Sequence, residues 1–83
     1  MKLYLVNYDL IQQKDYPKLW DALLKLGAKR VLLSTWVLRN AASATQVRDH
    51  LKSFVDFDDR VFITEMVGSN WGSWNALLNL SQF

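Results

Sequence analysis

The chain has 83 residues and a formal net charge of +2 at pH 7, and 51% of its residues are hydrophobic. This length fits one domain, and the absence of cysteine excludes a disulfide framework and a thiolate metal site. The charge balance, ten Lys and Arg against eight Asp and Glu, permits contact with nucleic acid but does not indicate it.

The chain opens with a strand at residues 3–9, Leu-Tyr-Leu-Val-Asn-Tyr-Asp, which is rich in apolar and aromatic residues. Lys2 precedes it without a cleavage-site pattern, and no apolar run in the chain is long enough to cross a bilayer. We therefore expect a cytoplasmic protein that makes no membrane contact. The strand ends at Asp9, which is either a turn-former or a ligand for something outside the strand.

A helix is expected next. Residues 12–15 form a polar loop, Asp15 is a candidate N-cap, and Pro17 falls in the first turn, where a missing N–H does little harm. Apolar residues then recur at three- and four-residue steps, at Tyr16, Leu19, Trp20, Leu23, Leu24 and Leu26. Gly27 stands where a left-handed C-terminal cap belongs.

The central part of the chain predicts two strands and a second helix. The β segment 30–39 is too long and unbroken for one alternating strand, so we place a tight reversal or bulge near residues 34–35. Ser43 and Gln46 fit a capping box, and the helix is expected to run to about Val55.

An acidic turn at residues 56–59 leads to the last strand, at residues 60–66. The tail, residues 68–83, carries Trp71 and Trp74 and suggests a short helix after a Gly-Ser-Asn turn. We expect one domain over residues 1–83, with its core at about 2–67.

The order strand, helix, strand, strand, helix, strand predicts a ferredoxin-like α+β fold. Two helices would cover one face of a four-stranded antiparallel sheet. The first strand is apolar at both alternations, which is typical of a strand with both faces covered. A second subunit, the tail, or both must cover the other face, and on this basis we expect a homodimer.

Several segments resemble a known family in their order. They are the strand ending in Tyr8-Asp9, the stretch 27–36 (Gly-Ala-Lys-Arg-Val-Leu-Leu-Ser-Thr-Trp), a helix of similar length, and Asp-Arg-Val-Phe-Ile at 59–63. Over roughly residues 3–66 the chain resembles the small CRISPR-associated adaptation protein, the second Cas protein. It is more similar still to the SinR-like and VapD-like branch of that family.

The resemblance implies a ferredoxin-like homodimer with the strand-end aspartates of both subunits near the two-fold axis. Some members have been assigned metal-dependent nuclease activity, and others are non-catalytic scaffolds that hold DNA. Carried over by position, Asp9 is the catalytic metal ligand, and Arg30 and Ser34 are nearby polar positions.

The chain departs from the family pattern in two places. Basic residues often follow the family's aspartate, whereas here residues 10–13 are Leu-Ile-Gln-Gln, which weakens the case for nucleic acid. The tryptophan-bearing tail replaces the family's usual extra strand, which speaks against an integrase partner.

Asp9 is the candidate ligand for Mg²⁺ or Mn²⁺, because these cations take oxygen ligands and one or two carboxylates with waters. One aspartate per subunit makes a poor site, whereas two paired across a dimer axis make a plausible one that can activate water for attack on a phosphodiester. The alternative is that Asp9 ends the strand by hydrogen bonding its own turn.

Three further polar residues are candidates for nucleic-acid binding. Arg30 and Arg39 bracket the central β segment and could contact phosphates, although solvated strand ends paired with surface acids are the simpler interpretation. Ser34 either orients a phosphate or water, or supplies a turn.

Other titratable residues give weaker signals. His50 has no Asp or Ser pattern beside it, and the acidic turn 56–59 lacks the glycine and closing glutamate of a calcium loop. Glu65 would supply a second carboxylate only if the strand register places it near the first strand.

The aromatic residues Trp36, Trp71 and Trp74 could stack on bases, but in a small apolar domain they more often belong to the core or an interface. We assign Tyr8, Trp71 and Trp74 to the dimer interface. Two functions remain open from the sequence: a metal-dependent nuclease, or a non-catalytic homodimer that binds nucleic acid or another protein.

Overall fold

A computed structural model of the chain describes residues 1–10 and 16–83. The elements are β1 (Lys2–Asp9), α1 (Tyr16–Lys25), β2 (Lys29–Leu32), β3 (Thr35–Asn40), α2 (Ala44–Leu51) and β4 (Arg60–Met66), with 3₁₀ turns at Lys52–Phe54 and Leu80–Gln82. The polar loop at residues 12–15 and its cap at Asp15 lie outside the described residues. Among the helices described, none has the length and apolarity that a membrane span needs.

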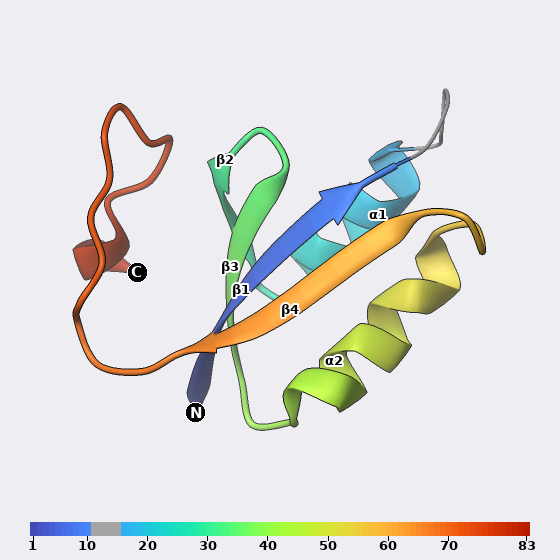
Figure 1. Cartoon of the computed structure of the whole chain (residues 1–83), viewed down its shortest axis with the longest axis horizontal. Helices are drawn as coiled ribbons and strands as arrows, with labels where there is room; N and C mark the ends of the chain where they lie inside the picture. The colour runs from blue at the N-terminus through green and yellow to red at the C-terminus, as the bar shows by residue number, and fades with distance from the viewer. Residues whose placement is uncertain (11–15) are drawn as a thin grey trace.

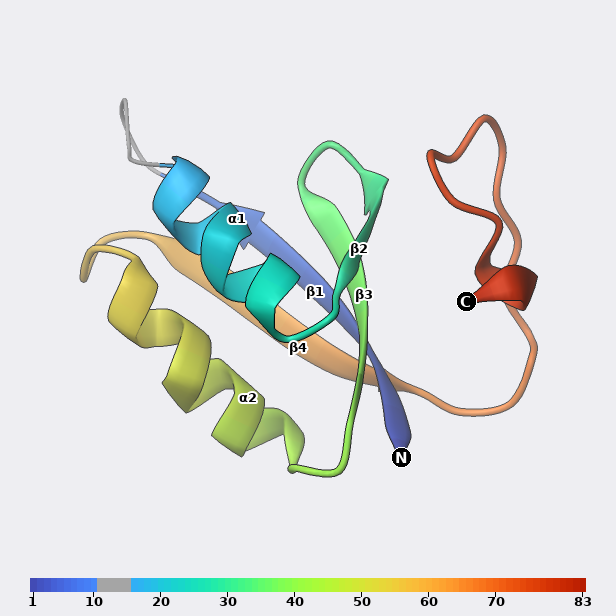
Figure 2. The ribbon, with the colours of Figure 1, turned by 180° about the vertical axis from the view of Figure 1, so that it is seen from behind.

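The four strands form one antiparallel sheet in the order β2-β3-β1-β4 (Figure 1). Both helices lie on the same face of this sheet, as Figure 2 shows from behind. This arrangement confirms the ferredoxin-like prediction. Because β1 is central and antiparallel to β4, the end of β1 meets the beginning of β4, with Asp9 opposite Arg60.

Local sequence signals account for the element boundaries. Gly27 follows α1 with a φ of 80°, a left-handed conformation that costs glycine little. Ser43 accepts the backbone N–H of Gln46, and the Gln46 side chain accepts the backbone N–H of Ser43, so the capping box is confirmed. The second helix is shorter than expected, since α2 ends at Leu51 and continues as a 3₁₀ turn to Phe54.

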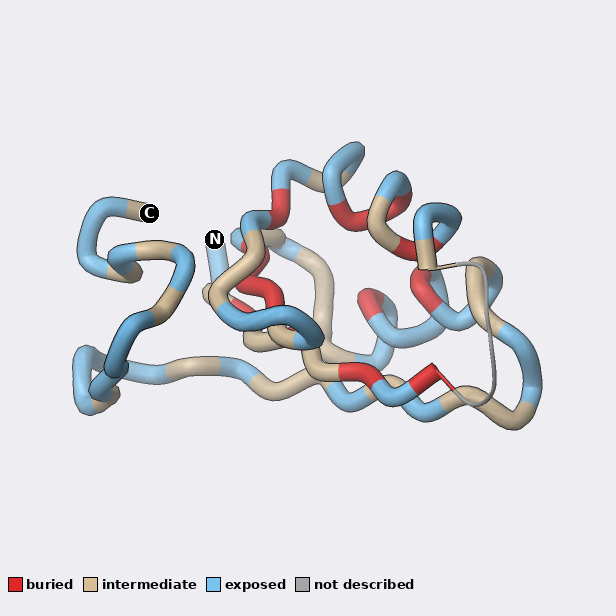
Figure 3. Tube along the Cα trace, turned by 90° about the horizontal axis from the view of Figure 1, so that it is seen from above, coloured by how far each residue is buried: buried red, intermediate tan, exposed pale blue. Residues whose placement is uncertain are grey.

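The core lies between the sheet and the two helices (Figure 3). Alternate β1 residues point into it, and three of them are buried, Tyr4, Val6 and Tyr8. The helices contribute buried side chains that include Leu19, Leu23, Val47 and Leu51. The two phases of β1 therefore differ in burial although both carry apolar residues.

The tail covers part of the sheet face that the helices leave open. Val37 points to that face and is nonetheless fully buried. The Leu77 N–H donates a 2.8 Å hydrogen bond to the Val31 carbonyl on β2, and Arg39 Nε donates a 3.3 Å bond to the Phe83 carbonyl. Figure 1 shows the tail on the β2 side of the sheet. The tail is irregular apart from its last 3₁₀ turn, and this corrects the helix expected there.

Coverage of this face does not reach the beginning of β4. Phe62 points outward from β4, and 66% of its surface is exposed. The second face is therefore covered by the tail beside β2 and β3 and stays open beside the beginning of β4.

Candidate functional site at the end of β1

A depression of about 500 Å³ lies where β1 ends, beside the β2–β3 turn and the beginning of β4. We call it the β1-end depression, and its lining residues are Asn7, Tyr8, Asp9, Ser34, Thr35, Arg60, Val61 and Phe62. It combines a carboxylate, a guanidinium, hydroxyl groups and one exposed aromatic ring.

Asp9 is exposed on the sheet face that points away from the helices, because it shares its phase of β1 with Asn7 rather than with the buried Tyr8. Its partner in the β1–β4 register is Arg60, which is also exposed. The Cβ atoms of directly opposed residues in an antiparallel pair are about 4.5–5.5 Å apart. The carboxylate and the guanidinium are therefore carried by neighbouring positions on one face of the sheet.

The β2–β3 turn is held against β1, and this brings Ser34 to the depression. The Tyr8 N–H donates a 3.3 Å hydrogen bond to the Ser34 carbonyl, and the Tyr8 hydroxyl bonds the Leu33 carbonyl at 3.3 Å. Thr35 Oγ1 donates to Asn7 Oδ1 at 2.7 Å. The predicted reversal near residues 34–35 is confirmed, and Ser34 and Asp9 line the same depression.

Arg30 does not join them. It is paired in register with Trp36, whose side chain points toward the helices, and its guanidinium carbon lies 4.5 Å from the Trp20 ring centroid and 4.8 Å from that of Trp36. Asp9 points to the opposite face of the sheet. The expectation that Arg30 lies near Asp9 is corrected by this alternation.

Tyr8 belongs to the chain's own core. Only 4% of its surface is exposed, and its hydroxyl accepts hydrogen bonds from Trp20 Nε1 at 2.7 Å and Trp36 Nε1 at 3.1 Å. This corrects the assignment of Tyr8 to a dimer interface, since its ring is packed against α1 and β3.

Arg39 lies at the other end of the sheet, opposite Leu3 rather than Asp9. Its guanidinium donates to the Phe83 carbonyl and stacks on the Phe83 ring at 5.4 Å. Arg39 therefore fastens the end of the tail, and the structure separates it from the β1-end depression.

The weaker candidates also lie apart from the depression. Glu65 pairs with Tyr4 in the register, five residues before Asp9, so it does not supply a second carboxylate to Asp9. His50 is exposed on α2 and meets the Phe54 ring edge-on at 5.4 Å.

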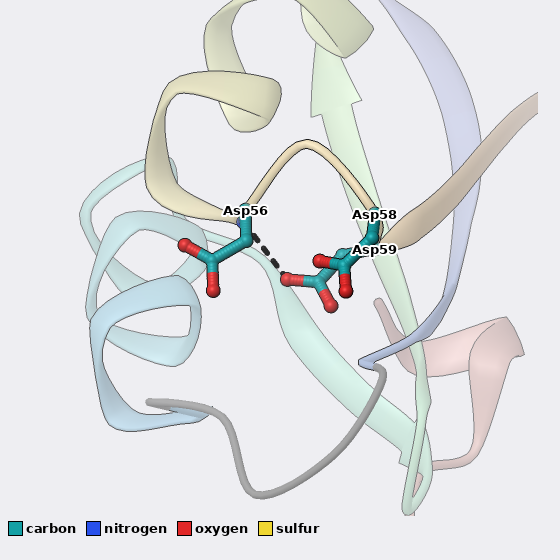
Figure 4. A group of neighbouring side chains, drawn as sticks. All are labelled: Asp56, Asp58 and Asp59. Atoms are coloured by element: carbon teal, nitrogen blue, oxygen red, sulfur yellow. Dashed lines mark hydrogen bonds between the residues drawn. The ribbon is translucent and has the colours of Figure 1, made fainter.

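The acidic turn before β4 gathers three carboxylates (Figure 4), with one oxygen each from Asp56, Asp58 and Asp59 within 4.8 Å of one another. The Asp56 N–H donates to Asp59 Oδ2 at 2.8 Å, and the Asp59 N–H donates to the Asp56 carbonyl at 3.1 Å. These two bonds close the turn that begins β4 and explain the placement of Asp59 without a cation.

Trp71 and Trp74 lie on the tail, on the far side of the sheet from α1 and α2. Together with the sheet they line an apolar cavity of about 390 Å³, and 86% of Trp74 is exposed. Their assignment to a dimer interface stays a prediction.

The β1-end depression suits a hard cation only in part. Among its lining residues the one carboxylate is Asp9, and the other oxygens belong to the Asn7 amide and the hydroxyls of Ser34 and Thr35. Mg²⁺ is commonly held by one or two carboxylates together with waters. A single chain supplies one carboxylate, the smaller of these two numbers, and a second copy of the chain would supply another.

Arg60 is the charged residue of this depression that the sequence analysis missed. A signal was present, because a ferredoxin-like sheet pairs the first strand with the last in antiparallel orientation. The end of the first strand, Asp9, must then meet the beginning of the last strand, which is Arg60.

No family model matches the chain. Its fold is similar to that of a hypothetical protein, TT1823 from Thermus thermophilus, known from a crystal structure. The TM-score is 0.73 and the sequence identity 23%, over 93% of this chain and 95% of that one. A likeness at this identity shows the fold alone.

Proposed function

We propose that the chain is a metal-dependent nuclease that works as a homodimer, with Asp9 of each copy as a ligand of a shared Mg²⁺ or Mn²⁺. The observation that carries this proposal is the position of Asp9. It is exposed at the rim of a depression that also holds Arg60 and Ser34, on the sheet face that the helices leave open.

Each residue of the depression has a role in this proposal. Asp9 holds the cation, which when bound polarises a phosphoryl oxygen and lowers the pKa of a bound water. Arg60 binds the phosphate through its fork of N–H donors and offsets negative charge on it. The Ser34 hydroxyl donates a hydrogen bond to a phosphate oxygen, and the two Tyr8 bonds to the turn keep Ser34 in place.

The proposal includes a dimer because one chain supplies a single carboxylate to the depression and because the sheet face beside it is open. A two-fold interface brings the same residue from both copies to one axis, so one Asp9 becomes two. Phe62 supplies exposed apolar surface in the same depression, which a second copy would bury.

The test is cleavage of labelled RNA and DNA by purified protein with Mg²⁺, with Mn²⁺ and with a chelator. We expect cutting only with metal, and its loss in Asp9→Ala and Asp9→Asn. Asp49→Ala is the matched control, because Asp49 is exposed on α2 and paired with Arg48 at 2.9 Å. Full cleavage by Asp9→Ala purified in the same way would show that another site or a contaminant cuts.

A non-catalytic homodimer that binds nucleic acid or protein is the second candidate. It is favoured by the single carboxylate among the lining residues and by the placement of Arg60 opposite Asp9, which can neutralise it. A gel-shift titration at two salt concentrations tests the nucleic-acid version, because affinity that depends on phosphate contacts falls steeply with salt. Binding without cleavage in every metal condition would favour this second function.

A further inference from the structure

We infer that Arg30 forms a second site, a receptor for a phosphate-type oxyanion, on the helix side of the sheet. This inference goes beyond the proposed nuclease, because the residues that line the two sites are different. Tyr8 connects them, since it lines the β1-end depression and its hydroxyl accepts hydrogen bonds from Trp20 and Trp36.

Arg30 is held in a fixed position by two indole rings, which we call the indole clamp (Trp20 and Trp36). The guanidinium carbon lies 4.5 Å and 4.8 Å from the two ring centroids. Both indole N–H groups donate to one acceptor, the Tyr8 hydroxyl, and the Trp20 ring also lies against the Tyr16 ring, tilted by 34° with the ring centroids 5.6 Å apart. These contacts fix the positions of the two indoles. The Arg30 side chain is therefore already ordered before a ligand binds, and binding does not cost that conformational entropy.

Stacking on the two rings supplies Arg30 with no hydrogen-bond acceptor. Its Nε is buried and has no hydrogen-bond partner, and the described residues provide no ion pair for its charge. Contact with a ring face stabilises the cation but satisfies none of its five N–H donors. A partly desolvated guanidinium is costly, and an oxyanion that bonds its terminal N–H groups offsets part of that cost, whereas the buried Nε stays out of a ligand's reach.

A surface hollow of about 420 Å³ opens beside this guanidinium. Its lining residues are Trp20, Leu24, Ala28, Lys29, Arg30 and Trp36, which include two cations and no acid. Lys29 precedes Arg30 on β2 and pairs with Val37, whose side chain points away from the helices, so the planar fork of Arg30 is the cation that faces this hollow.

The contacts favour phosphate over a nucleobase. One face of each indole is occupied by Arg30, and Trp20 additionally contacts the tilted ring of Tyr16, so a base stacked on the indoles at this point would have to displace the arginine. A phosphate group needs only the free edge of the guanidinium, where bidentate N–H···O bonds form. The phosphate is either free or part of a nucleic acid.

The clamp supplies its own reporter, since two of the four tryptophans contact the arginine. We suggest titrating the full chain, in chloride buffer, with inorganic phosphate and separately with a single-stranded oligonucleotide while recording tryptophan fluorescence. Arg30→Met keeps a long stem between the rings and removes the charge and the donors. Arg30→Lys keeps the charge and removes the fork, and Arg39→Met is the matched control, because Arg39 also stacks on an aromatic ring but lies elsewhere. Circular dichroism verifies that each variant folds.

We expect a saturable fluorescence change with phosphate that is weakened at least about tenfold in Arg30→Met. Arg30→Lys should weaken it less, and Arg39→Met should bind as the wild type does. If the oligonucleotide alone binds in this Arg30-dependent way, the phosphate belongs to a nucleic acid. The inference is overturned if folded Arg30→Met binds both probes with unchanged affinity, if the wild type binds neither, or if acetate binds more tightly than phosphate.

This test is independent of the nuclease proposal. Asp9→Ala should keep the Arg30-dependent fluorescence change with phosphate, because Asp9 points to the other face of the sheet. A failure at Arg30 with intact metal-dependent cleavage therefore rejects only the second site, and the reverse result rejects only the nuclease.

Discussion

The Trp20 indole N–H donates a 2.7 Å hydrogen bond to the Tyr8 hydroxyl, and this bond fastens α1 to the end of β1 one residue before Asp9. Trp36 donates to the same oxygen from β3 at 3.1 Å. One phenol thus connects a helix and two strands, and its own O–H bonds the turn that carries Ser34. The shape of the β1-end depression depends on a residue whose ring is in the core.

Tyr8→Phe is expected to destabilise the fold by about 2 kcal/mol, because it removes the shared acceptor and leaves two indole N–H groups without a partner near the core. Urea unfolding followed by circular dichroism measures the change. The transition midpoint should fall without a change in slope, since the surface exposed on unfolding stays the same.

Tyr4→Phe is the matched control, because the Tyr4 hydroxyl is bonded to one group, the Ala42 carbonyl. Its loss should be smaller than that of Tyr8→Phe. Equal losses for the two variants would mean that the shared acceptor adds nothing beyond an ordinary tyrosine bond.

Gly27→Ala is expected to destabilise the chain by about 1 kcal/mol, since a φ of 80° is unfavourable for a residue with a Cβ. The space around Gly27 is open, with no atom within 4 Å of an added Cβ, so the cost comes from the backbone alone. Thermal unfolding measures it. Gly72→Ala has equally open surroundings without a positive φ, and it should leave the melting temperature nearly unchanged.

The sequence predicted the local features of the fold because each has a short-range cause. The left-handed cap at Gly27, the capping box of Ser43 and Gln46, and the reversal near residues 34–35 are all found where their patterns stand. The element order then follows, and with it the pairing of the first and last strands.

The placement of the candidate site residues depended on which phase of a strand meets the helices, and here the sequence is ambiguous. β1 is apolar in both phases, so composition alone does not tell whether Tyr8 points inward or outward. The charge of Arg30 suggested exposure, yet its guanidinium lies against two indole rings. Arg30 is separated from Asp9 because it packs against Trp20 of α1. This contact joins residues that are distant in the sequence, so a short sequence pattern does not predict it.

Removal of the tail, residues 68–83, is expected to lower stability by about 2–4 kcal/mol. Val37 is fully buried on the face that the tail covers, and it would become exposed together with part of Leu5. Urea unfolding of the shortened chain measures the loss. Trp74→Ala should change the free energy of unfolding by less than about 0.5 kcal/mol, because that ring is 86% exposed. A shortened chain as stable as the full one would contradict this account of the second face.

Phe62→Lys is expected to break the dimer and leave the protomer folded. Phe62 points outward from β4 beside Asn7, in the depression where two copies would meet, and 66% of it is exposed. A lysine there remains solvated in the monomer, whereas in a two-fold interface it would bring two like charges together and desolvate them. Sedimentation velocity should show a dimer for the wild type and a monomer for the variant, with unchanged circular dichroism. Metal-dependent cleavage should also fall in this variant, since one copy supplies one Asp9.

Phe57→Lys is the control, because Phe57 is fully exposed on the acidic turn outside the β1-end depression, and this variant should stay dimeric and active. If Phe62→Lys remains a dimer, the interface does not include this part of β4. The proposal that the two Asp9 carboxylates share one ion would then be rejected.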